Sequence, residues 1–379
     1  MNALVTGSDG FVGRNLCAVL RRREDVQLVE YDLASAPQAL DKGLASADII
    51  YHLAGVNRPQ HPSEFQTGNA DFTAKICRRL VALGRAPKIV LTSSTQVEFD
   101  NPYGLSKRAA EEALRQYCQE AGAVGVAYRL KNLFGKWCRP NYNAVTATFC
   151  HNIARGLPIQ ISDPASRLDL SYIDDVVAAF VHELDPAAGE PGGFRFAQSL
   201  PSFTTTLGEL ASLIESFRAQ RTTLQVPDFS NPFVRALYAT YLSYLETDDF
   251  AYTLDIKTDQ RGSLAEFVKS SPFGQLFVSR TKPGVTRGNH FHHTKTEKFL
   301  VVEGEAVIRF RSILGGADII EYRVSGRDYR VVDIPPGYTH SIENVGVGEV
   351  VTLFWASEVF DPQRSDTQAL SVLPESHTP

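Results

Sequence analysis

The sequence predicts an α/β domain with a doubly wound parallel sheet, followed by an all-β domain that closes into a barrel. From residue 1 to about 180, short apolar segments alternate with amphipathic helical ones, which is typical of a parallel sheet covered on both faces. Residues 141–245 keep a helical pattern and are expected to form a smaller lobe. Near Asp248 the pattern changes, and segments rich in β-branched and aromatic residues follow one another without helices, as in antiparallel barrels.

The first part is expected to alternate strands with helices. The expected strands cover residues 2–6, 26–32, 49–53, 88–93 and 125–129. The expected helices cover residues 11–23, 71–83 and 106–120, with two more at 207–221 and 232–245 in the lobe.

The second part is expected to consist of strands alone, at residues 263–269, 275–282, 297–303, 305–311, 319–324, 328–333 and 350–356. These elements predict a first domain at 1–245, a linker at 246–257, a barrel domain at 258–370 and a tail at 371–379.

Composition limits the classes of function. The chain has 379 residues, 43% hydrophobic and 21% charged, which suits about two globular domains. Its net charge of −5 gives no reason to expect nucleic acid or an anionic membrane as a partner. Five widely spaced cysteines without a C-x-x-C pair indicate a reduced, cytoplasmic protein. We expect neither a leader peptide nor a membrane span.

Three glycines, Gly7, Gly10 and Gly13, follow the first expected strand and open the first helix. Glycine lets the backbone approach a pyrophosphate, which then faces the N-terminus of the helix. The alternative is a tight turn without a ligand. Further candidate contacts of a dinucleotide cofactor lie in this turn and after the second and third strands: Phe11, Val12, Arg14, Asp32, Leu53, Ala54 and Gly55.

A catalytic set follows in the same part of the chain. Tyr103 and Lys107 are four residues apart and share one face of a helix, and Ser94 follows the fourth strand. A lysine ammonium lowers the pKa of a nearby phenol, and a serine hydroxyl can hold the carbonyl that the phenol protonates. The set therefore predicts reduction of a carbonyl with a nicotinamide cofactor. Tyr103 and Lys107 are also expected to contact that cofactor.

The second part contains metal-ligating residues at characteristic spacings. His290 and His292 are two residues apart and point to the same side of a strand. Glu297 is expected on the paired strand and His340 on a third. Three imidazoles and one carboxylate suit Zn²⁺, Fe²⁺, Mn²⁺ or Ni²⁺. The alternative is a histidine-rich hairpin exposed to water.

Residues 1–245 resemble the extended short-chain dehydrogenases/reductases of the nucleotide-sugar type. The resemblance rests on the glycine triplet, the Ser94, Tyr103 and Lys107 set, and the stretches 129–135 and 172–176. It implies a Rossmann-type sheet, catalysis by that set, and a substrate contact from Asn132. Arg167 is a candidate contact of the substrate diphosphate, and the alternative for it is a surface charge. Asp32 favours NADH because an acid there binds the ribose 2′-hydroxyl, whereas Arg14 favours the 2′-phosphate of NADPH.

Residues from about 258 to 360 resemble sugar-nucleotide epimerases of the cupin superfamily, which are jelly-roll barrels. The resemblance implies that Lys298 lies near the keto oxygen of a substrate. These epimerases usually lack the full metal set that this sequence carries. His293 and a metal-bound hydroxide both remain candidates for the base that takes the proton. The alternative for Lys298 is an outward-facing lysine.

Nearly the whole chain resembles bifunctional enzymes of capsular polysaccharide and O-antigen biosynthesis. The stretches 55–59, 132–138, 238–245 and 288–302 carry this resemblance. It implies that the cupin epimerises C3 of a UDP-4-keto-6-deoxy-N-acetylhexosamine, and that the reductase then reduces C4 with NADPH. The product is UDP-2-acetamido-2,6-dideoxy-L-talose, on the UDP-N-acetyl-L-fucosamine pathway. The resemblance also implies bound zinc and a homodimer.

We therefore expect a cytoplasmic 3-epimerase and 4-ketoreductase. One alternative is a monofunctional nucleotide-sugar 4-ketoreductase whose cupin is a structural or dimerisation module. Another is a protein that binds a nucleotide and a sugar without turnover, which the intact Ser94, Tyr103 and Lys107 set disfavours.

Overall fold

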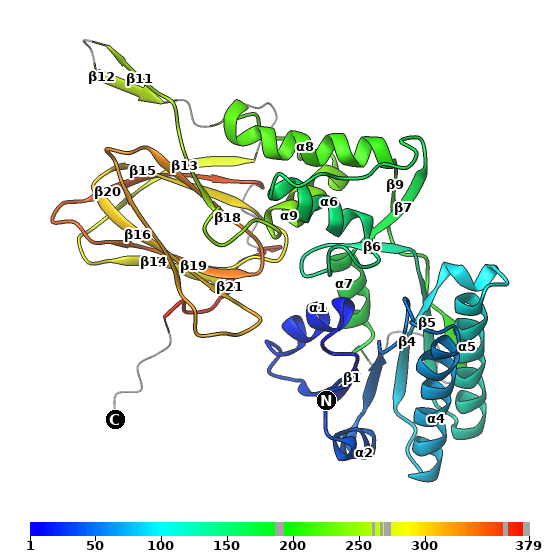
Figure 1. Ribbon diagram of the computed structural model, residues 1–379. Helices are drawn as coiled ribbons and strands as arrows, with labels where there is room; N and C mark the ends of the chain where they lie inside the picture. The colour runs from blue at the N-terminus through cyan, green and yellow to red at the C-terminus, as the bar shows by residue number, and fades with distance from the viewer. Residues whose placement is uncertain (186–192, 260–261, 266–267, 269–273, 359–362, 374–379) are drawn as a thin grey trace, which may run out of the picture. The chain divides into compact units, whose positions relative to one another are not determined.

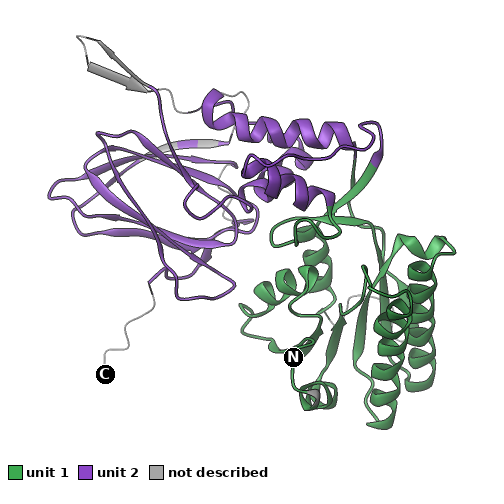
Figure 2. Ribbon diagram, viewed as in Figure 1, with its two compact units in different colours: residues 1–144, 168–204 green, residues 145–167, 205–379 purple. Residues whose placement is uncertain are grey.

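A computed structural model describes residues 1–185, 193–259, 262–265, 268, 274–358 and 363–373 (Figure 1). The chain forms two compact units (Figure 2). Unit 1 consists of Met1–Ala144 and Leu168–Thr204, and unit 2 of Val145–Arg167 and Thr205–Pro379. In the part of the chain described, no helix is long and apolar enough to cross a membrane.

Unit 1 is built on a six-stranded sheet in the order β2-β1-β3-β4-β5-β8, in which every pair of neighbours is parallel. Its strands are β1 (Asn2–Thr6), β2 (Gln27–Tyr31), β3 (Ile49–His52), β4 (Lys88–Ser94), β5 (Val124–Leu130) and β8 (Gly193–Phe196). The parallel sheet expected from the alternating pattern is therefore confirmed. Strand β8 was not expected, because its Gly-Phe-Arg-Phe sequence is too short to show a period.

Helices cover both faces of this sheet (Figure 1). The first face carries α2 (Pro37–Ser46), α4 (Phe72–Ala82) and α5 (Pro102–Ala121), which share one apolar core with the strands. The second face carries α1 (Phe11–Leu20) and α7 (Ile173–His182). Tyr51 of β3 reaches this face, where its hydroxyl donates to the Phe180 carbonyl of α7 at 2.8 Å.

Helix α5 begins four residues earlier than expected, because Asn101 caps it. The Asn101 side chain accepts a hydrogen bond from Gly104 N at 2.8 Å, and Pro102 occupies the first turn. The helix ends at Gly122, which has φ 63°. Tyr103 and Lys107 therefore lie in the first two turns of the helix.

Short elements connect these strands and helices. They are α3 (Ser63–Phe65), the π-helix η1 (Gln66–Asp71), the 3₁₀ helix η2 (Thr95–Glu98), and the strands β6 (Asn132–Phe134), β7 (Arg167–Tyr172) and β9 (Phe203–Thr206). The three strands form a small sheet in which β6 pairs with β7 in parallel.

Unit 2 contains two five-stranded antiparallel sheets that stack on each other (Figure 1). The ring of Phe299 on one sheet lies 5.7 Å from the ring of His340 on the other. The first sheet is β10 (Ala251–Thr253), β18 (Arg330–Ile334), β15 (Glu297–Glu303), β20 (Val350–Ala356) and β13 (Gln275–Thr281). The second is β17 (Ile320–Ser325), β16 (Glu305–Ser312), β19 (Tyr338–Asn344), β14 (Thr286–Phe291) and β21 (Gln368–Ala369). A hairpin of β11 (Ile256–Asp259) and β12 (Gly262–Ala265) precedes β13.

Unit 2 also includes the helices α6 (Val145–Ala154), α8 (Leu207–Thr223) and α9 (Pro232–Leu242). The sequence assigns them to the first domain, but they pack with the sheets. Phe229, between α8 and α9, lies 5.5 Å from the ring of Trp355 on β20. The boundary near residue 245 is therefore not a boundary between compact units.

Two further expectations differ from the structure. The expected linker contains β10, in which Tyr252 pairs with Val331 of β18. The expected tail begins with an ordered stretch, since Val372 is fully buried. Part of the strand expected at 263–269 lies outside the described residues. All five cysteines are buried thiols outside any disulfide.

Candidate functional site

The turn between β1 and α1 is packed too closely for a side chain at two of its glycines. Gly7 has φ +74°, and a Cβ on it would lie 2.6 Å from Ala54 N. A Cβ on Gly13 would lie 2.0 Å from the Gly7 carbonyl oxygen. These glycines therefore bring the start of α1 against the end of β1, the arrangement that presents a helix N-terminus to a pyrophosphate. Around the turn, Phe11 and Val12 are half-buried and Arg14 is exposed.

Asp32 follows β2 and turns its carboxylate to the glycine turn. Its Oδ2 accepts a hydrogen bond from Asp9 N at 2.8 Å, and its Oδ1 accepts one from Leu33 N at 2.7 Å. The carboxylate is thus held in place beside the expected path of a cofactor. This position suits hydrogen bonding to a ribose hydroxyl.

The segment after β3 reaches Lys107, the lysine of the predicted catalytic set. A Cβ on Gly55 would lie 3.2 Å from Lys107 Nζ and 2.8 Å from Asn69 Oδ1. Asn69, in the π-helix η1, accepts from Val56 N at 2.8 Å and donates to Ser106 Oγ at 3.0 Å. It therefore ties this segment to α5. The sequence gives no signal for Asn69, because a π-helix has no recognisable pattern, although such turns occur often at functional sites.

Ser94, Tyr103 and Lys107 come together at the end of β4 and the start of α5. Ser94 is the last residue of β4, not a residue beyond it, and its hydroxyl accepts from Gln96 N at 3.2 Å. The Lys107 ammonium donates to the Thr92 carbonyl at 3.0 Å and lies 5.9 Å from the centre of the Tyr103 ring.

The electrostatics of this set differ from the scheme drawn from the sequence. The pKa of Tyr103 is raised by burial, and a hydrogen bond with Ser94 offsets part of this rise. Burial also lowers the pKa of Lys107 to about 8, against the effect of Glu111. The phenol therefore keeps its proton at neutral pH, as a proton donor requires.

The two expected substrate contacts are both exposed. Asn132 begins β6 and pairs with Leu170 of β7. Arg167 is the first residue of β7 and is also exposed. Both side chains can reach a ligand from solvent.

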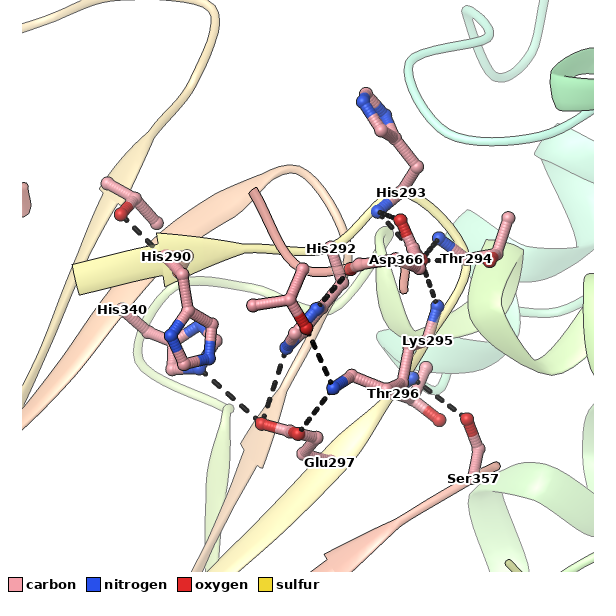
Figure 3. A network of polar contacts seen from close by, with 12 residues as sticks. His290, His292, His293, Thr294, Lys295, Thr296, Glu297, His340, Ser357 and Asp366 are labelled. Atoms are coloured by element: carbon pink, nitrogen blue, oxygen red, sulfur yellow. Dashed lines mark hydrogen bonds and ion pairs between the residues drawn. The ribbon is translucent and has the colours of Figure 1, made fainter. Parts of the chain in front are cut away.

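Four side chains of unit 2 converge between the two sheets: His290, His292, Glu297 and His340. Each offers one ligand atom, and these atoms all lie within 4.8 Å of one another. The cluster is largely buried and is drawn from three strands and one loop (Figure 3). The spacing that the sequence shows is thus a cluster in space and not an exposed hairpin.

A bulge in β14 turns His290 toward His340. Pairing passes from Gly288 opposite Ser341 to His290 opposite His340, so Asn289 is the extra residue. Gly288 and Asn289 have φ of 96° and 56°, conformations that suit these two residues. The rings of His290 and His340 consequently lie 4.6 Å apart.

The donor atoms of the cluster suit a divalent metal ion. Glu297 Oε2 lies 3.4 Å from His292 Nε2 and 3.5 Å from His340 Nε2. Both of these nitrogens are buried without a hydrogen-bond partner among the described residues. Buried polar atoms are ordinarily satisfied, so the cluster has the character of a ligand set.

Burial favours the neutral imidazole of His290 and of His340, and metal binding requires neutral imidazoles. Burial lowers the pKa of His290 to about 4 and also lowers the pKa of His340. Burial alone would raise the pKa of Glu297, but His292 and His340 lower it well below its usual value.

Lys298, which the resemblance places near the keto oxygen of a substrate, does not belong to this cluster. Its ammonium donates to Asp333 Oδ1 at 2.5 Å and to Tyr252 Oη at 3.2 Å. Neighbouring residues of a strand point to opposite faces, so Lys298 turns away from the side that Glu297 faces. Lys298 is nevertheless buried, so the outward-facing surface lysine is not observed either.

The lysine at the cluster is Lys295, which the sequence analysis did not single out. Its ammonium lies 3.1 Å from Glu297 Oε1. The alternation that excludes Lys298 could have indicated Lys295, because residues 295 and 297 share a face when the strand is extended. His293, a candidate base, points away from the cluster (Figure 3).

Known proteins share both parts of the chain. Residues 3–194 match the NAD dependent epimerase/dehydratase family, and residues 257–368 match the polysaccharide biosynthesis C-terminal domain. A Pseudomonas aeruginosa protein named UDP-2-acetamido-2,6-beta-L-arabino-hexul-4-ose reductase is 45% identical over 372 residues, covering 98% of this chain and 99% of the relative.

Solved structures extend the likeness to three dimensions. The crystal structure of the capsular polysaccharide assembling protein CapF from Staphylococcus aureus is 46% identical, has a TM-score of 0.67, and covers 98% of this chain and 100% of its own. The UDP-glucuronic acid 4-epimerase from Bacillus cereus in complex with NAD is 19% identical, has a TM-score of 0.51, and covers 58% of this chain and 83% of its own. The second likeness concerns the fold alone.

Proposed function

This chain belongs to the NAD-dependent epimerase/dehydratase family, and from that premise we propose that it is a bifunctional, cytoplasmic UDP-sugar enzyme. Its first activity epimerises C3 of a UDP-4-keto-6-deoxy-N-acetylhexosamine. Its second reduces the C4 ketone and gives UDP-2-acetamido-2,6-dideoxy-L-talose. The observation that carries the proposal is that two chemically different sites, a Ser-Tyr-Lys set and a His₃Glu cluster, lie in separate compact units.

The reductase activity is assigned to unit 1. A bound nicotinamide cofactor supplies the hydride that adds to C4. Tyr103 donates the proton that the oxygen at C4 takes up, so the ketone becomes an alcohol. Ser94 holds that oxygen through its hydroxyl, and the Lys107 ammonium binds the ribose of the cofactor and stabilises the phenolate left on Tyr103. The name of the Pseudomonas aeruginosa relative, a reductase of a UDP-hexul-4-ose, supports this assignment.

For the cofactor we propose a preference for NADPH over NADH, following the family resemblance. Arg14 is exposed beside the glycine turn, where it can meet a 2′-phosphate. Asp32 opposes this preference, because its anchored carboxylate repels that phosphate. Steady-state kinetics with both cofactors decide the matter. A kcat/KM at least tenfold higher for NADH, about 1.4 kcal/mol, would show that Asp32 prevails.

The epimerase activity is assigned to the cluster of unit 2, which we propose to be a cupin-type zinc site. His290, His292, Glu297 and His340 would hold the ion, and related divalent transition metals would fit the same donors. When bound, the ion would act as a Lewis acid that polarises the ketone. The C3 proton is acidic because it is next to the C4 ketone, so epimerisation has to precede reduction.

A second candidate function is a 4-ketoreductase in which the β domain serves only as a structural or dimerisation module. The burial of the cluster favours this alternative, because zinc held by four protein ligands is the usual structural arrangement. Both candidates are compatible with a homodimer.

Two variants of the full chain distinguish the candidates. In heavy water, Tyr103→Phe should still exchange the C3 proton of the 4-keto sugar while consuming no reduced cofactor. A variant with His290→Ala and Glu297→Ala should exchange no C3 proton, yet bind reduced cofactor as the wild type does. Loss of exchange in Tyr103→Phe, or normal exchange in the double variant, would remove the epimerase role from the cluster.

A further inference from the structure

The C-terminal segment 363–373 crosses the cluster of unit 2. Its strand β21 pairs with β14, so that Ala369 lies opposite His290 and Gln368 opposite Phe291. Thr339, next to His340, donates its hydroxyl hydrogen bond to the Leu370 carbonyl. The segment is thus bound to two of the strands that carry the histidines.

One residue of this segment, Asp366, organises the loop between β14 and β15. Its carboxylate accepts hydrogen bonds from three successive backbone N–H groups, those of His293 at 2.9 Å, Thr294 at 2.6 Å and Lys295 at 2.7 Å. It also accepts one from Thr294 Oγ1 at 2.9 Å (Figure 3). Hydrogen bonds to an ionised acceptor are about twice as strong as neutral ones. The carboxylate therefore fixes the loop immediately after His292.

The same residue holds the His292 ring. The Asp366 carbonyl oxygen lies 2.6 Å from His292 Nδ1. A carbonyl only accepts, so Nδ1 carries the proton and Nε2 keeps its lone pair. That lone pair is on the side of Glu297, whose Oε2 is 3.4 Å away. Asp366 thus sets both the position and the tautomer of one member of the cluster.

We propose that Asp366 is a positioning residue, and that the segment 363–373 is a strap which has to be docked for the cluster to hold its metal ion tightly. This inference rests on the metal site of the proposed function. A partner that orients a ligating histidine changes metal affinity by about 10- to 100-fold. Asp366 holds the ring of His292 through its carbonyl and the loop after His292 through its carboxylate, so it belongs in that range.

The test measures zinc release from the full-length protein. Zinc-loaded wild type, Asp366→Ala, Asp366→Asn and Ser365→Ala are mixed with a chromophoric chelator, and the rate of zinc transfer is followed. Asp366→Ala should release zinc at least tenfold faster than wild type. Asp366→Asn retains one acceptor oxygen and should fall between them. Ser365 is the exposed neighbour on the strap, so Ser365→Ala should release zinc at the wild-type rate.

A second measurement reports on the strap itself. Trypsin cleavage after Arg364, which is exposed on the strap, should be slowed by zinc in the wild type. In Asp366→Ala the zinc should protect this bond far less. Unfolding temperatures of all variants separate this role from a general effect on stability, which would lower the transition without changing zinc release at 25 °C.

The outcomes distinguish the two proposals. A wild-type protein that takes up no zinc would overturn the metal site and the strap together. Zinc uptake by the wild type, with wild-type release and cleavage rates in both Asp366 variants, would overturn the strap alone. If Asp366→Ala fails to fold, Asp366→Asn should still release zinc faster than Ser365→Ala. Equal release rates in these two variants would overturn the strap.

Discussion

In the proposed reduction, the ammonium of Lys107 is the titrating group on which the reaction depends. Its pKa is lowered to about 8 by burial, while Glu111 raises it, and Tyr103 keeps its proton because burial raises the pKa of the phenol. Below pH 8 both groups are therefore protonated. Above pH 8 the lysine loses the charge that binds the cofactor ribose and stabilises a phenolate.

The first prediction concerns the pH profile of the reductase. The kcat/KM for reduced cofactor should be level below pH 8 and fall about tenfold per pH unit above it, since one proton is lost from the free enzyme. Glu111→Gln removes the charge that raises the pKa of Lys107, so it should shift the fall to lower pH. Glu112→Gln, on the exposed side of the same helix, should not. A profile that stays level to pH 10 would contradict the role given to Lys107.

The second prediction separates two glycines of one motif. Gly13→Ala places a Cβ 2.0 Å from the Gly7 carbonyl oxygen, so the turn has to open. Gly10→Ala places one 3.1 Å from the same atom, which a small shift relieves. Fluorescence titration with reduced cofactor should show at least a tenfold weaker Kd for Gly13→Ala than for Gly10→Ala. Equal affinities would mean that the cofactor does not depend on this turn.

Some roles of single residues follow from the sequence and others do not. The pairs Tyr103–Lys107 and His290–His292 share a face because of helix and strand periodicity, which is local. The resemblance places Lys298 near the keto oxygen of a substrate. Strand periodicity instead turns it to the face opposite Glu297, which is where the structure has it. Asp366 lies 74 residues from His292, and no local pattern relates two residues so far apart.

The bulge in β14 is the element that shapes the cluster. A strand without the extra residue Asn289 would pair one residue out of register, and a one-residue slip turns every following side chain to the other face. Gly288 makes the bulge possible, because a Cβ there would lie 2.9 Å from the His340 carbonyl oxygen.

The third prediction follows from that contact. Gly288→Ala should disturb the bulge and reduce the zinc content below half an ion per chain, measured by mass spectrometry of metals. Gly284→Ala is the matched control, because Gly284 also has positive φ, but a Cβ on it would meet no atom of the described residues within 4 Å. The control also places a side chain at positive φ, but without the contact to the His340 carbonyl, and should keep its zinc. Full zinc in Gly288→Ala would show that the register does not depend on the glycine.

Strands β1 to β5, strands β15 to β18 and the longest helices could be predicted to within a few residues, because their periods are visible in the sequence. Helix α7 escaped prediction as an element, since its apolar residues are nearly continuous and show no period. The start of α5 was misplaced because the cap at Asn101 precedes the amphipathic pattern. Pairing of β21 with β14 depends on the tertiary fold alone.

A buried polar network joins the helices and sheets of unit 2. Arg221 of α8 pairs with Asp333 of β18 at 3.3 Å, and Asp333 pairs with Lys298 of β15 at 2.5 Å. Burial alone would lower the pKa of Lys298, but Asp333, with Tyr238 and Tyr252, raises it well above its usual value. Lys298 therefore stays charged because of these partners.

The fourth prediction gives Lys298 a structural role. Lys298→Met leaves Asp333 buried with a poorer partner, which costs about 3–5 kcal/mol, so the unfolding temperature of the unit should fall by about 6–20 °C. Adding Asp333→Leu removes the stranded charge and should recover part of the loss. Calorimetry measures both effects, and the zinc content should stay at the wild-type value. A Lys298→Met protein of normal stability that loses C3 exchange would instead support a catalytic role.

The division of the whole chain could not be predicted from local composition. The change of pattern near Asp248 marks the end of the helices and predicts a boundary near residue 245, whereas the compact units divide the chain elsewhere. Residues before that point bury their side chains against strands that come after it, as Phe229 does against Trp355. Which elements pack together depends on those distant contacts.

The order of contacts in unit 2 has a consequence for how the protein is made. Arg221 leaves the ribosome 112 residues before Asp333. At about 5–20 residues per second, that interval lasts roughly 5–20 s. During this time helices α8 and α9 have no sheet to cover them, and Phe229 waits for Trp355. The nascent chain therefore presents an apolar helical surface until Asp333 and its strand have been synthesised. This is the interval in which a chaperone can bind that surface.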